Sequence, residues 1–245
     1  MNQIASKLPE WLKQPLRKLW NLRYYGNARF CPVCEKSSNQ FKQFGEIPRE
    51  DAMCPNCGSF ERQRLLWLFL TEKTDFFNGK QKKMLHVAPE TCFEIKFREV
   101  LGQGYVTADL YNSNAMVNMD ITDIQYPDQS FDYIYCSHVL EHILDDAKAM
   151  SEFYRVLKNG SWAILLVPIV GDKTYEDASI VEPEERLKAF GQSDHVRIYG
   201  LDYVDRLRKA GFTVDTIKVS DLVNDKEAVR LGLTPASGDV FYCTK

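Results

Sequence analysis

The sequence MLHVAPE (84–90) begins the segment at residues 84–167, which is the most informative about the fold. This is a short apolar run followed by a turn that can open a helix, with Pro89 suited to a first helical position. A second apolar run ends at Asp109, and FDYIYCSHVLEH (131–142) contains another. Short apolar runs that alternate with helical segments indicate a mostly parallel sheet covered by helices on both faces.

The chain is therefore expected to be an α/β protein with a seven-stranded, mostly parallel sheet. Strands are predicted at residues 83–87, 104–109, 115–119, 131–136, 161–168, 212–219 and 238–244. Helices are predicted at residues 60–78, 90–101, 145–158, 184–190 and 201–210. Residues 169–199 form a long polar stretch without strand periodicity. A stretch of that length in a compact domain usually has a functional role or forms a lid.

The bulk properties limit the classes of protein to consider. A chain of 245 residues holds one substantial α/β domain and a small appendage. Its 44% hydrophobic and 27% charged residues are ordinary for a globular protein. Its net charge of −3 argues against a nucleic-acid-binding polycation. No apolar run suits a membrane span or a signal peptide, which predicts a cytoplasmic location.

Residues 1–29 form a basic arm, with six lysines and arginines against one glutamate, a balance of +5. Apolar residues recur in it at helical spacing, namely Ile4, Leu8, Trp11, Leu12, Leu16, Leu19 and Trp20. Three roles stay open for this arm. It can pack against the protein itself or a second subunit, contact a membrane surface through residues 1–25, or contact nucleic acid. The acidic remainder of the chain disfavours the last of these.

Four of the seven cysteines form two pairs, in CPVC (31–34) and CPNCG (54–58), with 19 residues between the pairs. Each pair can form a turn that directs two thiolates to one point, and four thiolates complete a tetrahedral Zn²⁺ site without an open position. The sequence therefore predicts a structural zinc ion in a zinc ribbon over residues 30–59. Its ligands are Cys31, Cys34, Cys54 and Cys57. The alternative is a zinc-free core with free thiols, as in other cytosolic proteins.

Ligands of open parallel sheets bind beyond the carboxyl ends of the strands, where the strand order reverses. Asp109 stands at such an end, 22 residues after Val87. A carboxylate there can accept hydrogen bonds from both hydroxyls of a ribose. The alternative role of Asp109 is to cap a turn. Asp120 is a second candidate, with an Asx-type turn as the alternative.

Several motifs resemble those of class I S-adenosylmethionine (SAM) dependent methyltransferases, and the type 11 methyltransferases in particular. They are the first turn, Asp109, Asp120-Ile121-Thr122, residues 131–142 and YRVLKNG (154–160). The resemblance implies a Rossmann-like domain with SAM as its cofactor. It places Asp109 at the ribose and Asp120 and Ile121 at the adenine. The implied cofactor contacts are His86, Val87, Ala88, Glu90, Asp109, Leu110, Asp120, Ile121, Ser137 and His138. The first turn departs from the family because it lacks a Gly-x-Gly run, and Ala and Pro cannot adopt every conformation open to glycine.

Histidine is well suited to remove a proton near neutral pH, and the chain has four. His138, His142 and His195 are the candidate catalytic residues, whereas His86 is expected to be a buried, hydrogen-bonded residue. On a helix, His138, Glu141 and His142 would share one face. They are then candidates for a second divalent metal, as in quinone O-methyltransferases with acidic and histidine residues at matching positions, although His138 replaces the first glutamate. Three roles stay open for these side chains. They can act as a base, bind a metal, or form hydrogen bonds with nearby backbone.

The whole pattern predicts a SAM-dependent methyltransferase that acts on an oxygen atom of a small-molecule, glycan or lipid-linked acceptor. One alternative is an RNA methyltransferase that uses the zinc ribbon and the arm as a clamp. Another is a non-catalytic module that binds SAM or a nucleotide. The predicted parts are the arm at 1–29, the zinc ribbon at 30–59, a connecting helix at 60–82 and the methyltransferase domain at 83–245. A membrane-peripheral location follows if the arm binds a membrane surface.

Overall fold

The computed structural model of the protein describes residues 22–45 and 48–245. They divide into two compact units. The sheet unit comprises Asp75–Lys218 and Gly238–Lys245, and the cysteine unit comprises the described residues up to Thr74 together with Val219–Ser237. Most of the predicted arm lies outside the described residues, and so does the membrane contact assigned to it. Within the described part of the chain, no helix has the length and apolar character needed to cross a bilayer.

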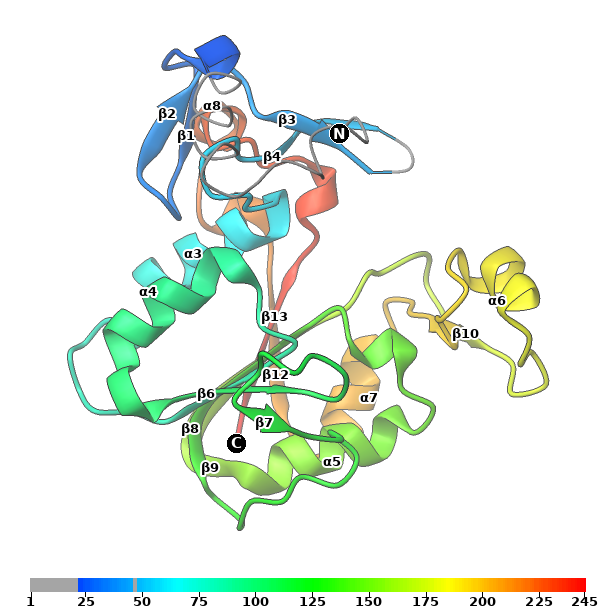
Figure 1. The fold of residues 1–245 in the computed structure, drawn as a ribbon. Coiled ribbons are helices and arrows are strands. Elements are labelled where there is room, and N and C mark those ends of the chain that lie inside the picture. The colour runs from blue at the N-terminus through cyan, green and yellow to red at the C-terminus, as the bar shows by residue number, and fades with distance from the viewer. Residues whose placement is uncertain (1–21, 46–47) are drawn as a thin grey trace. The chain divides into compact units, whose positions relative to one another are not determined.

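The sheet unit is built on seven strands in the order β12-β13-β9-β8-β5-β6-β7 (Figure 1). Along the chain they are β5 (Met84–Val87), β6 (Tyr105–Asp109), β7 (Val117–Asn118), β8 (Phe131–Ser137), β9 (Leu157–Leu166), β12 (Thr213–Ile217) and β13 (Val240–Thr244). β13 runs antiparallel to both of its neighbours, and the other pairings are parallel. The predicted seven-stranded, mostly parallel sheet is confirmed. The chain moves outward from β5 through β6 and β7 and then places β8 on the other side, so the strand order reverses beside β5.

Helices cover both faces of this sheet. α4 (Thr91–Leu101) connects β5 to β6, and α5 (Asp146–Val156) connects β8 to β9 on the opposite face (Figure 1). The opposite placement follows from two right-handed crossovers that leave the centre in opposite directions. α7 (Tyr203–Lys209) precedes β12 and lies beside α5. Each of the longer helices buries one apolar stripe, with Phe93, Phe97 and Leu101 in α4 and Ala149, Met150, Phe153 and Val156 in α5.

The core lies on both sides of β8, which is why this strand reads as a nearly continuous apolar run. Tyr133 stacks on Trp162 of β9 with ring centroids 4.2 Å apart. Tyr135 faces α4, where its ring meets Phe93 edge to face at 6.0 Å. Ile134 and Cys136 point to the other face and are fully buried. β8 is thereby clamped between two packed layers, and the loop that follows it starts from a rigid position.

The polar stretch predicted at residues 169–199 has secondary structure of its own. β10 (Tyr175–Glu176) pairs antiparallel with β11 (Arg197–Ile198), and α6 (Pro183–Phe190) lies between them in sequence. The two ends of the insert approach closely at Gly200, where an added Cβ would lie 2.3 Å from the Lys173 backbone. Two 3₁₀ turns, Gly102–Gly104 and Leu140–His142, complete the elements of the sheet unit.

The cysteine unit consists of two small hairpins and two helices. β1 (Arg29–Cys31) pairs with β2 (Lys36–Ser38), and β3 (Lys42–Phe44) pairs with β4 (Arg49–Met53). The helices are α3 (Glu61–Lys73) and α8 (Asp225–Arg230), and 3₁₀ turns lie at Leu22–Tyr24, Val219–Asp221 and Pro235–Ser237. The segment with α8 falls within the part of the chain that was predicted as methyltransferase domain, yet it packs with the cysteine hairpins. The predicted connecting helix also belongs to the cysteine unit as far as Thr74.

Candidate active site and cysteine cluster

The carboxyl ends of three adjacent strands form the edge at which a cofactor was predicted. Val87, the last residue of β5, is level with Ala108 of β6 and with Cys136 of β8. The next residue along each strand is Ala88, Asp109 and Ser137 respectively. The structure therefore brings three of the predicted cofactor-binding residues into one row, at the point where the strand order reverses. This is where ligands of open α/β sheets bind.

Two residues at this edge have a backbone conformation that L-residues rarely adopt. Ala88 has φ = 48° and His138 has φ = 57°. A non-glycine residue in the left-handed region costs on the order of 1–3 kcal/mol, and such residues concentrate at functional sites. Ala88 stands in the turn where the sequence lacks the expected glycine, and its φ is one that glycine adopts freely. The missing Gly-x-Gly run has therefore not removed the left-handed turn after β5.

A chain of buried hydrogen bonds supports the first turn from below. His86 has no exposed surface, and its Nδ1 lies 2.8 Å from the hydroxyl of Tyr105 while its Nε2 lies 3.0 Å from Oε2 of Glu90. The Tyr135 hydroxyl donates to Oε1 of Glu90 at 3.0 Å. Burial, with help from nearby Glu94, raises the pKa of Tyr105, so this phenol keeps its proton. His86 is thus the hydrogen-bonded buried residue that was expected, and the network holds Glu90 at the start of α4.

The two predicted aspartates each use one oxygen to cap a turn. Oδ1 of Asp109 accepts from the amides of Tyr111 and Asn112, both at 2.7 Å. Oδ1 of Asp120 accepts from the amide and the hydroxyl of Thr122, both at 2.8 Å, and these bonds lower the pKa of Asp120. The alternative role predicted for each aspartate, capping a turn, is therefore observed for its Oδ1 atom. No hydrogen bond to another described residue engages Oδ2 of either carboxylate, so each retains an acceptor for a ligand.

The remaining predicted cofactor residues differ in exposure. Ile121 is buried and Leu110 is 39% exposed, so an apolar surface remains open next to Asp109. The Ser137 hydroxyl is buried and has no hydrogen-bond partner among the described residues. A buried hydroxyl without a partner is uncommon and marks a place where a ligand can complete the bonding. The residues at this edge therefore fit a ligand with a polar ribose and a flat, apolar ring.

The expectation that His138, Glu141 and His142 share a helix face is wrong. The chain leaves β8 through the left-handed His138 and makes only a three-residue 3₁₀ turn, Leu140–His142. The carbonyl oxygens of Leu140, Ile143 and Leu144 accept hydrogen bonds from the Arg197 guanidinium, so they have partners outside a continued helix. α5 consequently begins only at Asp146.

His195 takes the place beside Glu141 and His142 that was predicted for His138. The ligand atoms of Glu141, His142 and His195 all lie within 4.8 Å of one another. The His142 and His195 rings meet edge to face at 4.7 Å, and Nδ1 of His142 is 3.3 Å from Oδ2 of Asp194. Burial lowers the pKa of His195, and the neighbouring His142 lowers it further. A neutral imidazole at His195 can act as a base or as a metal ligand.

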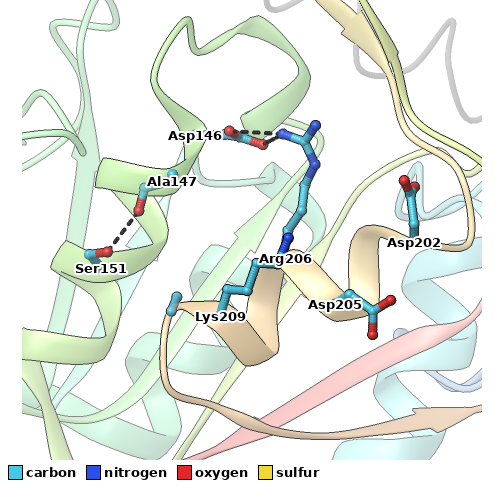
Figure 2. A pocket seen from close by; sticks show the side chains of 8 residues that line it. Asp146, Ala147, Ser151, Asp202, Asp205, Arg206 and Lys209 are labelled. Carbon is cyan, nitrogen blue, oxygen red and sulfur yellow. Dashed lines mark hydrogen bonds and ion pairs between the residues drawn. The ribbon is translucent and has the colours of Figure 1, made fainter.

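A separate cavity of about 460 Å³ lies between α5 and α7 and contains none of the predicted site residues. Its lining residues are Asp146, Ala147, Ser151, Asp202, Asp205, Arg206, Lys209 and Ala210 (Figure 2). Figure 2 shows Arg206 reaching Asp146, whose two carboxylate oxygens accept its hydrogen bonds at 3.0 and 3.2 Å. Arg206 also pairs with Glu176. The main charges of this cavity thus neutralise each other, which makes it a poor candidate for the reaction centre.

The four paired cysteines converge as predicted. Sγ of Cys31 is 3.7 Å from Sγ of Cys57, and Sγ of Cys34 is 3.8 Å from Sγ of Cys54. A regular tetrahedron with Zn–S bonds of about 2.3 Å has S···S edges of about 3.8 Å, so the thiols are spaced for zinc. All four are free of disulfide bonds. Hydrogen bonding from Cys34 and the other thiols lowers the pKa of Cys31, so the cluster readily holds a thiolate.

The chain is similar to known methyltransferases. The family described as "Methyltransferase domain" matches residues 91–165. Ajmaline N-methyltransferase from Rauvolfia serpentina is 31% identical over 144 residues, which are 58% of this chain and 46% of that protein. This chain therefore spans less than half the length of that relative.

One of two similar solved structures superposes closely enough to show the fold. A SAM-dependent methyltransferase from Mesorhizobium loti superposes with a TM-score of 0.51 at 13% identity, over 73% of this chain and 97% of that one. A SAM-dependent methyltransferase from Archaeoglobus fulgidus gives a TM-score of 0.48 at 14% identity, over 75% and 94% of the two chains. With the strand order, the first superposition shows that the sheet unit has the fold of a SAM-dependent methyltransferase, and residues 91–165 of this unit match the methyltransferase-domain family.

Proposed function

We propose that the protein transfers the methyl group of SAM to an acceptor bound beyond the carboxyl edge of its sheet. The observation that carries this proposal is the row formed by Ala88, Asp109 and Ser137 at the reversal of strand order. The left-handed Ala88 and the unsatisfied Ser137 hydroxyl at the same edge support it. Bound SAM supplies a methyl group already activated by its sulfonium, so the protein has to bind, orient and manage a proton.

Different residues of this edge contact different parts of the cofactor. Oδ2 of Asp109 accepts from the ribose hydroxyls while Oδ1 keeps its turn in place. Leu110 and Ile121 contact the adenine, with Asp120 beside it. The Glu90 carboxylate, fixed by His86 and Tyr135, attracts the ammonium group of the methionine part.

The acceptor is proposed to be a small molecule, free or as part of a glycan or lipid, and the reacting atom to be a hydroxyl oxygen. The curated relative is named for a small-molecule acceptor, ajmaline. The loop after β8 and the insert at residues 169–199 surround the histidines that such a reaction needs, because a hydroxyl must lose its proton before or during methyl transfer. His138, His142 and His195 remain the proposed candidates for that role.

The cysteine cluster is proposed to hold a structural zinc ion. Four thiols in tetrahedral spacing leave no coordination position for a substrate. Burial lowers the pKa of Arg64, and negative charge on Cys31, Glu61, Cys54 and Cys57 opposes this shift and favours the charged form. A zinc–tetrathiolate centre carries two negative charges, so it would stabilise this cation in the same way.

The first experiment is calorimetric titration of SAM and S-adenosylhomocysteine into the zinc-loaded protein. Asp109→Asn is the informative variant, because its amide oxygen can still accept the turn bonds while the other position becomes a donor. We expect SAM binding to weaken by about 10- to 100-fold, as for loss of charged hydrogen bonds. The exposed Asp123 provides the control variant Asp123→Asn, with unchanged binding. Folded wild-type protein that binds neither ligand would rule out the proposal.

A further inference from the structure

Three side chains with metal-binding groups converge directly after β8. The ligand atoms of Glu141, His142 and His195 lie within 4.8 Å of one another. Glu141 is 2% exposed and His195 is 7% exposed, while the His142 side chain is 31% exposed. Burial of a carboxylate beside two imidazoles has a large desolvation cost unless a charge compensates it. A divalent cation would provide that compensation.

The two segments that carry these side chains are joined through their backbones. The Val196 amide donates to the Glu141 carbonyl at 2.9 Å. Arg197, which is 4% exposed, donates from one guanidinium to the carbonyl oxygens of Leu140, Ile143 and Leu144. Val196 and Arg197, the two residues after His195, therefore hold the turn that bears Glu141 and His142. Such support from locked neighbours is what holds a binding constellation in place.

Each histidine also has a hydrogen-bonding partner outside the three-residue cluster. Nδ1 of His142 lies 3.3 Å from Oδ2 of Asp194, and a backbone hydrogen bond links His195 to Phe190. Metal-binding histidines almost always donate their second N–H to a carboxylate or a carbonyl oxygen, which fixes the tautomer and directs the free nitrogen to the metal. The arrangement around both rings matches this pattern.

We propose that Glu141, His142 and His195 bind one divalent transition-metal cation, and that this cation takes the acceptor hydroxyl as a further ligand. One carboxylate and two imidazoles suit zinc, iron or cobalt, and three protein ligands leave at least one open position. This role of the cation rests on the proposed methyltransferase function. The site differs from the four-cysteine cluster, which is closed.

The reaction at such a centre balances without an added reagent. Coordination weakens the acceptor O–H bond, and its proton passes to water. The oxygen lone pair then forms the new O–CH₃ bond while the C–S bond of the sulfonium breaks, and that electron pair stays on sulfur in S-adenosylhomocysteine. The three side chains hold the cation, whose positive charge stabilises the alkoxide.

Co²⁺ is a suitable probe once the cysteine cluster has been filled with one equivalent of Zn²⁺. Calorimetry and visible absorption should show one further equivalent of Co²⁺, with the weak bands of nitrogen and oxygen ligands and without intense thiolate bands. Loss of an outer partner commonly weakens metal binding about 10- to 100-fold. We therefore expect about a 10-fold loss or more for Asp194→Asn, and about a 100-fold loss or more for Glu141→Gln and for His142→Gln.

His138→Gln is the matched control, because His138 lies outside the cluster although it precedes Glu141 by only three residues. Its Co²⁺ affinity should equal that of the wild type. Equal binding by Glu141→Gln and His142→Gln would show that Co²⁺ occupies another place, and loss of binding in His138→Gln would show a different ligand set. Either result overturns the proposed site. Circular dichroism of each variant confirms that it is folded.

A SAM titration of the same zinc-loaded samples separates the two proposals. Folded wild-type protein that binds SAM but no second cation overturns the metal site and leaves the methyltransferase proposal intact. Protein that binds Co²⁺ at this cluster without binding SAM overturns the role given to the cation in methyl transfer. Binding of both, with the Co²⁺ bands shifted by an acceptor hydroxyl, supports the complete proposal.

Discussion

At the scale of single residues, Asp132 at the start of β8 shows how one carboxylate joins two strands. Oδ2 of Asp132 accepts from the Lys83 amide at 2.9 Å and from Nζ of Lys158 at 2.8 Å. Burial by itself raises the pKa of Asp132, but the hydrogen bonds from Lys158 and Lys83 outweigh it, so the pKa lies below its ordinary value. A carboxyl group with a lowered pKa in the folded state stabilises the fold above its unfolded pKa of about 3.9, and this contribution is lost as the pH falls.

We therefore expect Asp132→Asn to lower the free energy of unfolding by about 1 kcal/mol at pH 7, since Lys158 is partly solvated. Urea unfolding at pH 7 and at pH 3 measures the effect, and the difference between wild type and variant should shrink at the lower pH. Asp123→Asn, at an exposed position, should change neither value. A difference that stays constant between pH 7 and pH 3 would contradict the ionic role of Asp132.

At the scale of elements, Arg64 of α3 joins three parts of the cysteine unit. Its side chain is fully buried and donates hydrogen bonds to the carbonyl oxygens of Asp51, Ala52, Ser59, Leu231 and Gly232. The turn after α8 reaches Arg64 because Gly232 has φ = 62°, and an added Cβ there would lie 2.6 Å from the ring of Phe41. The planar fork of arginine satisfies five carbonyl groups that no other side chain could reach together.

Arg64→Met should leave these buried carbonyl groups without donors, at a cost of about 3 kcal/mol or more. The segment at residues 225–237 should lose protection against hydrogen exchange, because two of the five bonds hold it. Exchange measured by mass spectrometry on peptides from this segment tests the prediction. Arg62→Met on the same helix is the matched control, and an equal loss of protection in that variant would show that Arg64 has no special role.

At the scale of the whole molecule, the two compact units depend on different forces. The sheet unit has an extensive aromatic core, whereas the cysteine unit has short hairpins, and small folds of that kind usually need a metal or disulfides. Chelation of zinc should therefore remove hydrogen-exchange protection from residues 31–59 while β5, β8 and β9 keep theirs. Cys54→Ser should reproduce the chelated state, and Cys92→Ser should not. Unchanged protection of residues 31–59 after complete removal of zinc would contradict a structural metal.

The features that could be predicted from the sequence are those with local signals. Strand and helix periodicity along residues 83–244 predicted the seven-stranded sheet. The place of Asp109 at the end of a predicted strand indicated that its side chain lies at the carboxyl edge of that sheet. The spacing of the two cysteine pairs predicted their convergence, because each pair forms its own turn. These features follow from neighbouring residues and from the rules of parallel sheets.

Contacts between residues far apart in the sequence became visible only in the folded protein. Helical spacing suggested His138 with Glu141 and His142, but Arg197 took the backbone carbonyl groups of that turn and brought His195 there instead. Likewise, nothing in the sequence indicated that Arg64 donates to carbonyl oxygens that precede and follow the main segment of the sheet unit in sequence. Side-chain hydrogen bonds between segments far apart in sequence leave no periodic trace, since their energy depends on three-dimensional geometry alone. The sequence therefore determined the sheet and its ligand-binding edge, and the packing of the insert determined which side chains gather beside that edge.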